Sequence, residues 1–228
     1  RRVLFRSVLM RLDRGAESRE QLERALALTT SAAGRARIHG KLGQLAFRQG
    51  DHPRASEELE RALALLGRPV PATRAALVLE TAREGVRHLW HRSRPGTAGP
   101  GSGAPGAEQQ PEHDLVVQLH TQLPHLWWFQ RGTLPALWSH LHRLNLTERR
   151  PASRELALAY AFHARVIGAL GLFRTALGHA RRSLQISAGL DDQWSRGHAR
   201  FVQGALLYAA SRHGEAVDAL TLAIPDLE

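Results

Sequence analysis

Histidine is the most chemically suggestive residue type in this sequence, because the 228-residue chain holds 13 of them. Glu84, His88 and His91 follow one another at i, i+4 and i+7, so a helix would carry all three on one face. Zn²⁺ accepts a carboxylate and two imidazoles as ligands. A polar helix face is the alternative, and we favour it because no second cluster supports a metal site. His140 and His142 diverge on a helix and cannot pair as ligands.

Sequence motifs for catalysis are missing. A phosphate-binding loop needs clustered glycines followed by Lys-Ser or Lys-Thr, whereas Lys41 is followed by Leu42. No HExxH, GxSxG or kinase signature occurs. The chain has no cysteine to act as a nucleophile or zinc ligand. We therefore expect no catalytic residue, no cofactor, no metal and no enzymatic activity in this chain. A longer parent protein would carry any ATPase, kinase or cyclase module elsewhere.

Aromatic side chains cluster in one short segment. Trp127, Trp128 and Phe129 are consecutive, and Trp138 follows within the next helical stretch. Such a group suits a ligand platform or a partner hot spot, but we favour core packing. Two adjacent tryptophans cannot both point inward on one helix. One of them is expected to face a groove or a neighbour.

The formal charge of +10 suggests nucleic acid as a ligand. However, the arginines are spread along the chain and alternate with acids, as in Arg19-Glu20, Glu60-Arg61 and Arg83-Glu84. Solvated helix faces of mixed charge explain this pattern better. A basic helical module that binds nucleic acid in a transcription regulator stays as the alternative. It would lose affinity steeply with added salt, because phosphate contacts release counterions.

Apolar residues recur with helical spacing along most of the chain. Between Gly50 and Gly67 they fall at i, i+4, i+7, i+8 and i+11, and no segment alternates with the period of a strand. Asp51 and Ser153 are expected to cap helices. The apolar runs are too short to cross a bilayer, and no signal-peptide core is present. The chain is predicted to be cytoplasmic, without membrane contact. The apolar residues with helical spacing between Gly50 and Gly67 are Ala55, Leu59, Ala62, Leu63 and Leu66.

The chain divides at a segment with almost no residues to bury. Residues 93–111 are rich in Gly, Pro, Ala and Ser and predict a flexible linker between helical repeats at 8–92 and 112–228. The chain begins at Arg1 without Met, and Leu4-Phe5-Arg6-Ser7 is what a common sequencing adaptor encodes in frame. Residues 1–7 are therefore predicted to be non-native or disordered. The whole sequence is interpreted as a fragment of a longer protein.

Small residues repeat with a fixed spacing. Gly43, Ala55 and Ala62 are separated by twelve and then seven positions. Where two helices cross most closely, large side chains would push the backbones apart. A hairpin cannot bury its apolar stripe alone, so several must stack. The same spacing recurs in Ala164, Ala176 and Ser183 and in Gly204, Ala216 and Ala223, and a turn residue follows each first member by seven positions: Gly50, Gly171 and Ser211.

These positions resemble the tetratricopeptide repeat, with Leu42-Gly43, Gly50 and the two alanines matching best. The resemblance implies an all-α fold, an α-α superhelix (a TPR-like solenoid) of stacked antiparallel helix hairpins. It also implies a non-catalytic scaffold that binds protein. Around Ala136 the repeat is degenerate, with Pro124 and Arg143 where small residues belong. Pro124 is expected to kink or start a helix.

A narrower resemblance covers residues 62–92 and 134–171, which look like the helical region of large bacterial signalling ATPases. The segments 66–71 and 144–149 carry this likeness. It implies protein–protein or interdomain contacts within a bacterial signal-transduction ATPase, multidomain kinase or cyclase-type regulator. The expected partners are other domains of the parent chain or a signalling protein, with nucleic acid and membrane not expected.

The repeat register also predicts which residues line a concave groove, because the first helix of each hairpin faces it in this family. A groove of mixed basic and aromatic character would suit an acidic or extended peptide. The predicted groove residues are Arg37, Gln44, Phe47, Arg48, Arg165, His198, Phe201 and Tyr208.

Overall fold

The computed structural model describes residues 15–93, 110–148 and 151–228. Helices and their turns account for these segments, and no strand occurs in them, so the predicted all-α class is confirmed. Residues 1–7 and most of the predicted linker lie outside the described residues. None of the described helices has the length and apolarity required to cross a membrane.

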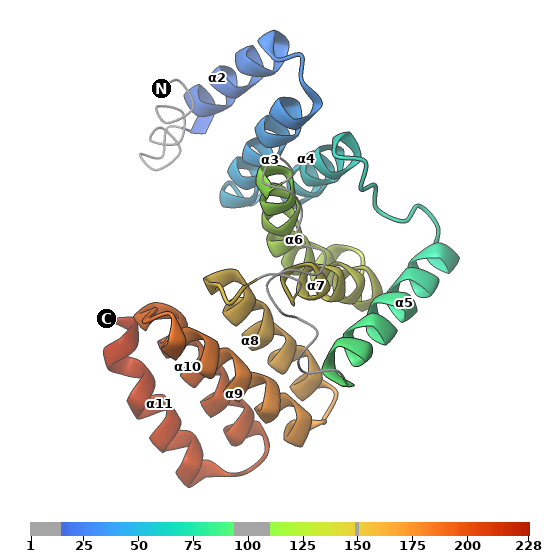
Figure 1. The fold of residues 1–228 in the computed structure, drawn as a ribbon. Helices are drawn as coiled ribbons and strands as arrows, with labels where there is room; N and C mark the ends of the chain where they lie inside the picture. The colour runs from blue at the N-terminus through green and yellow to red at the C-terminus, as the bar shows by residue number, and fades with distance from the viewer. Residues whose placement is uncertain (1–14, 94–109, 149–150) are drawn as a thin grey trace. The chain divides into compact units, whose positions relative to one another are not determined.

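The helices follow one another along the chain (Figure 1). In chain order they are α2 (Gly15–Leu28), α3 (Ala32–Arg48), α4 (His52–Leu65), α5 (Arg74–Ser93), α6 (Gln110–Gln130), α7 (Thr133–Glu148), α8 (Arg154–Ala169), α9 (Phe173–Gly189), α10 (Gln193–Ala209) and α11 (His213–Leu227). Only three residues separate each helix from the next between α8 and α11.

Side-chain caps define several helix starts. Asp51 accepts a hydrogen bond from the backbone N–H of Arg54, and Ser153 accepts one from Leu156, as the sequence predicted. The expected turn residues also lie at helix ends. Gly50 and Gly171 have φ of 76° and 77°, which glycine adopts without steric cost. Ser211 takes the equivalent place with φ of 60°.

The chain forms two compact units, which are described separately. Unit 1 consists of Arg1–Arg83 and Pro105–Ser139, and unit 2 consists of Glu84–Ala104 and His140–Glu228. Each unit therefore draws on segments from both sides of residues 94–109. The predicted division of the chain at residues 93–111 stays a prediction.

In unit 1, α3 and α4 form an antiparallel hairpin that α2 and α6 contact. Leu22, Leu42 and Leu45 are buried together between α2 and α3. Gly43 lies where α3 meets α4: a Cβ atom added there would be 2.9 Å from Leu59 and 3.2 Å from the carbonyl oxygen of Ala55. A larger residue at position 43 would push the hairpin apart.

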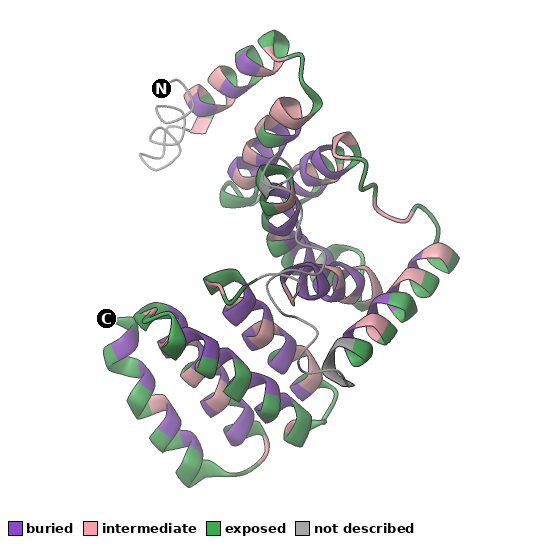
Figure 2. Cartoon of the chain, in the orientation of Figure 1, coloured by how far each residue is buried: buried purple, intermediate pink, exposed green. Residues whose placement is uncertain are grey.

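In unit 2, α8, α9, α10 and α11 stack side by side as successive hairpins (Figure 1). Buried positions gather on the sides of these helices that face their neighbours (Figure 2). Gly204 repeats the geometry of Gly43, since an added Cβ atom would be 2.6 Å from Leu220 and 3.3 Å from the carbonyl oxygen of Ala216. The remaining members of the small-residue triplets, Ala62, Ala164, Ala176, Ser183 and Ala223, are all buried.

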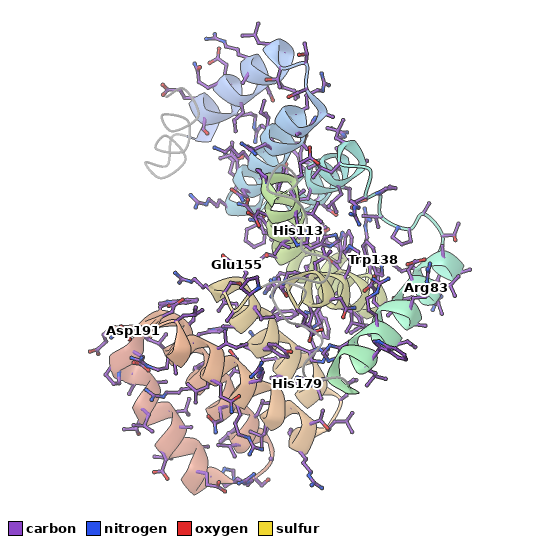
Figure 3. The ribbon with its side chains drawn as sticks, in the orientation of Figure 1. Arg83, His113, Trp138, Glu155, His179 and Asp191 are labelled. Carbon is purple, nitrogen blue, oxygen red and sulfur yellow. The ribbon has the colours of Figure 1, made fainter. Side chains whose placement is uncertain are left out.

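The degenerate repeat is built differently from the others. Pro124 lies inside α6 rather than at its start. Trp127 is fully buried and donates a hydrogen bond from Nε1 to Ser56 Oγ at 2.7 Å, whereas Trp128 is 44% exposed. This confirms that the two adjacent tryptophans do not both point inward. Trp138, labelled in Figure 3, stacks on Trp127 with ring centroids 6.2 Å apart.

Candidate functional site

The exposed face of α10 carries the most distinctive surface chemistry of unit 2. Trp194, Phe201 and Tyr208 follow one another at intervals of seven residues, which places them on one side of the helix. All three are exposed, with Phe201 at 47% and Tyr208 at 66%. Exposed aromatic side chains that lie together in a row, rather than singly, mark an interaction surface. The sequence predicted Phe201 and Tyr208 but missed Trp194.

Positive charge flanks this aromatic row. The guanidinium of Arg154 lies 4.9 Å from the centre of the Trp194 ring, and Trp194 stacks on His198 with centroids 5.4 Å apart. Burial lowers the pKa of His198, and the charge of Arg165 lowers it further. Arg165 on α8 is exposed and forms no ion pair with the described carboxylates. The exposed face of α10 thus carries a row of aromatic rings, and arginines from α8 lie along one side of this row.

The other predicted groove residues lie in unit 1, on α3. Arg37, Phe47 and Arg48 are exposed, and Gln44 is half-buried. Phe47 packs edge-on against His52, the first residue of α4, with centroids 5.6 Å apart. Tyr208 and His213 occupy the same relative positions in unit 2, at 5.3 Å. The α3–α4 hairpin and the α10–α11 hairpin therefore each expose an aromatic ring at the same position. The predicted groove residues fall into two sets, one in unit 1 and one in unit 2.

A second site lies in the interior of unit 2, where four histidines meet. His88 on α5, His163 on α8 and His179 on α9 are buried, and each offers a ring nitrogen within 4.8 Å of the others. Figure 3 labels His179 on α9. His140 on α7 joins them, because its Nε2 is 2.9 Å from Nδ1 of His163. Burial lowers the pKa of His140 well below its usual value, and the neighbouring His163 and Arg143 add to this.

One carboxylate, that of Glu148, lies beside the histidines. Nδ1 of His88 lies 3.2 Å from Oε1 of Glu148, and the Tyr160 hydroxyl donates to the same oxygen at 2.8 Å. Burial raises the pKa of Tyr160, and the charge of Glu148 raises it further, so the hydroxyl stays protonated. His179 stacks on the Tyr160 ring with centroids 5.9 Å apart.

Glu84 lies in a separate polar network and does not join His88 as a ligand. Nδ1 of His142 donates to it at 2.9 Å, and the Asn145 amide donates at 2.6 Å. Burial alone would raise the pKa of Glu84, but these hydrogen bonds and the charges of His142 and Arg87 lower it to about 2. The predicted face of Glu84, His88 and His91 is therefore not one group, and the side chain of His91 is outside the described residues.

The sequence missed the histidine cluster because its members are far apart in the chain. His88, His140, His163 and His179 come from four helices, and spacing within one helix cannot reveal them. The divergence of His140 and His142 was predicted correctly, since His140 meets His163 and His142 meets Glu84. Only the fold of unit 2 brings the four imidazoles together.

Comparison with known proteins supports the repeat. Residues 7–67 match the tetratricopeptide repeat family. The chain carries a tetratricopeptide-like helical repeat. This segment contains the α3–α4 hairpin and the close contact between Gly43 and Ala55. No curated protein matches the sequence.

Solved structures show the same fold. The crystal structure of BtubC (BKLC) from P. vanneervenii matches with a TM-score of 0.67 and 17% identity, covering 99% of this chain and 78% of that one. At this identity the likeness concerns the fold alone. It supports the all-α fold over the length of the chain, beyond the residues that match the repeat family.

Proposed function

We propose that the chain is a non-catalytic scaffold whose α10 face binds an extended, acidic segment of another protein or of another domain. Tetratricopeptide-like repeats generally bind proteins, which supports the class of partner. The observation that carries the proposal is the exposed row of Trp194, Phe201 and Tyr208 beside Arg165. The parent context that we propose is a bacterial signal-transduction ATPase or a related regulator.

The dimensions of the row fit an extended peptide. Seven helical residues advance by about 10 Å, so the row spans roughly 20 Å from Trp194 to Tyr208. An extended chain covers that length with about six residues. Each aromatic ring would receive one apolar side chain, and acidic residues between them would meet Arg165, since Arg154 already pairs with Asp192 at 3.5 Å. Aromatic side chains and arginines dominate binding energy at protein interfaces.

Peptide binding to the whole chain tests the proposal. A library of ten-residue peptides with alternating acidic and apolar positions would be measured by fluorescence anisotropy, together with basic versions of the same peptides. We expect binding of acidic peptides only, with a loss of tenfold or more in Phe201→Ala and in Arg165→Glu. Arg174→Glu, an exposed charge reversal on α9, is the matched control and should leave affinity unchanged.

Two outcomes would contradict this function. Equal peptide affinity in Arg165→Glu and Arg174→Glu would remove the α10 face as the site. Tight binding of a labelled oligonucleotide with a steep salt dependence, and no binding of acidic peptides, would favour the nucleic-acid alternative. The signalling context has its own test in the coding sequence on both sides of this segment, where a nucleotide-binding ATPase domain would support it.

A further inference from the structure

We propose that His88, His163 and His179 form a binding site for one divalent transition-metal ion, with Zn²⁺ as the ion that fits best. The three side chains come from α5, α8 and α9 of unit 2 and are all at least nine-tenths buried. Their nearest ring nitrogens lie within 4.8 Å of one another. The site is separate from the α10 face and does not depend on the proposed peptide binding.

The spacing of the ring nitrogens suits a tetrahedral ion. Zn–N distances of 2.0–2.1 Å place two ligand nitrogens about 3.4 Å apart. Small rotations of imidazoles that already lie within 4.8 Å would reach that separation. Three histidines occupy three of the four positions, and water can take the fourth, as in zinc sites with three protein ligands.

His88 is already oriented as a ligand. Its Nδ1 faces Glu148 at 3.2 Å, and its Nε2 is buried without a hydrogen-bond partner among the described residues. A buried nitrogen without a partner is costly, because it has lost water and gained nothing in return. A metal-ligating histidine usually donates its other N–H to a carboxylate, which fixes the ring and raises the basicity of the ligand nitrogen. Glu148 supplies that carboxylate.

His163 has an equivalent support. Nδ1 of His163 lies 2.9 Å from Nε2 of His140, so a hydrogen bond between the two rings fixes the orientation of His163. His140 is thereby a positioning residue rather than a ligand. His179 is held by stacking on Tyr160, whose hydroxyl donates to Glu148. Two of the three proposed ligands are therefore tied to the same carboxylate, directly or through Tyr160.

The ligand set determines the class of metal. Imidazole nitrogen without thiolate suits Zn²⁺, Cu²⁺, Ni²⁺ and Co²⁺, whereas Ca²⁺ and Mg²⁺ require oxygen ligands. The buried guanidinium of Arg143 opposes a cation nearby, and Glu155 counters its charge. Glu148 adds a negative charge directly behind His88. Imidazoles packed together with no metal function are the alternative that the experiment must exclude.

Metal titration of the intact chain tests the site. The protein would be stripped with a chelator and titrated with Zn²⁺ against a chromophoric competitor. Co²⁺ would then report the coordination geometry through its visible absorption. We expect one Zn²⁺ per chain with a Kd of about 1 μM or tighter, and intense Co²⁺ bands typical of four-coordination. Zn²⁺ should also raise the melting temperature, because it binds only the folded chain.

Variants separate this cluster from the other histidines. His88→Gln and His179→Gln should each weaken Zn²⁺ binding by tenfold or more, and Glu148→Gln by roughly tenfold through the lost support. His52→Gln and His213→Gln, both exposed and outside the cluster, are the matched controls and should not change the Kd. Circular dichroism would show that each variant is folded.

The outcomes are decisive even where a variant fails to fold. X-ray absorption of the Zn²⁺-loaded wild-type chain counts imidazole ligands directly, and three supports the site. Fewer than three imidazoles, no saturable binding at micromolar Zn²⁺, or equal affinity in His88→Gln and His213→Gln would each overturn it.

Discussion

Glu84 shows how unit 2 keeps a carboxylate ionised in its interior. The side chain is 3% exposed, yet it receives hydrogen bonds from His142, Asn145 and Arg87. Asn145 also donates to the backbone carbonyl of Glu84 at 2.9 Å, which ties α7 to α5. A buried charge that is paired in this way stabilises the fold only while it stays ionised.

The pH dependence of stability should reveal this pairing. The folded pKa of Glu84, about 2, is below the value of 4.5 for a free glutamate. Its contribution is therefore complete above pH 4.5 and is lost as the pH falls toward 2. At pH 6 we expect Glu84→Gln to lower the free energy of unfolding by roughly 2–3 kcal/mol. Urea unfolding at several pH values measures this.

The same experiment contains its own control. The difference between wild type and Glu84→Gln should shrink as the pH is lowered from 4.5 to 3, because Glu84 then binds a proton in the unfolded chain while it stays ionised in the folded chain. Glu215→Gln, at an exposed position on α11, should change stability little at either pH. A constant difference for Glu84→Gln across this range would show that the charge is not involved.

For single residues, the sequence predicted which side chains share a helix face better than it predicted which residues on other helices they contact. Helical spacing identified Glu84 and His88 as neighbours on one face, and the structure places both in the interior of unit 2. Their partners are His142 for Glu84 and Glu148 for His88, 58 and 60 residues further along the chain. The spacing of residues along a helix shows only which of them share a face. It therefore could not show whether the face of Glu84 and His88 contacts solvent or which helix it contacts.

At the scale of helices, some glycines are required by close packing and others are not. Gly204 on α10 lies against Leu220 and the backbone of α11, whereas an added Cβ atom at Gly178 on α9 would meet nothing within 4 Å. Both lie in helix interiors, where glycine costs backbone entropy. Only at Gly204 does the close approach of two helices require a missing side chain.

Paired alanine substitutions should separate the two cases. Gly178→Ala is expected to raise the free energy of unfolding by about 0.5–1 kcal/mol, since it adds helix propensity without a clash. Gly204→Ala should lower it by up to about 2 kcal/mol, because overpacking exceeds the same gain. Thermal or urea unfolding checks both. An equal gain in the two variants would show that α10 and α11 do not depend on the close contact.

Sequence spacing predicted the helix hairpins well because the requirement for small residues is local. Gly43 and Gly204 meet Leu59 and Leu220 in the same way, although their hairpins are far apart in the chain. The degenerate region was harder to predict. Pro124 lies inside α6, although a proline in a helix interior removes one backbone hydrogen bond. The helix tolerates it where the surrounding packing compensates for that loss.

At the scale of the whole chain, the composition of the compact units is the main result. Unit 2 includes residues 84–104 as well as residues 140–228. Residues 84–93 of α5 supply Glu84 and His88 to its interior. The sequence predicted a division near residues 93–111, because a Gly- and Pro-rich segment usually separates domains. Composition does not reveal that α5 contributes to a core formed by later helices.

Truncation at the predicted division should expose this dependence. Residues 112–228 alone would lack Glu84, the partner of His142 and Asn145, and His88, a partner of Glu148. We expect a cost of about 1–3 kcal/mol for each buried polar group that loses its partner. We expect a lower unfolding midpoint than that of the full chain. A synthetic peptide of residues 80–93 should restore part of the loss in a saturable way, as measured by circular dichroism.

A matched peptide sharpens the result. The same peptide with Glu84→Gln and His88→Gln should restore much less stability, because it keeps the apolar face of α5 but lacks its buried polar groups. If residues 112–228 unfold at the same denaturant concentration as the full chain, α5 contributes nothing to unit 2, and this account of its core is wrong.

The origin of α5 also has a consequence for synthesis on the ribosome. Glu84 precedes its partner His142 by 58 residues. At a translation rate of 5–20 residues per second, the newly made carboxylate waits about 3–12 s before its partner is polymerised. During that interval the second half of α5 has no completed core to join. Unit 2 therefore reaches its final packing only after α8 and α9 have left the exit tunnel.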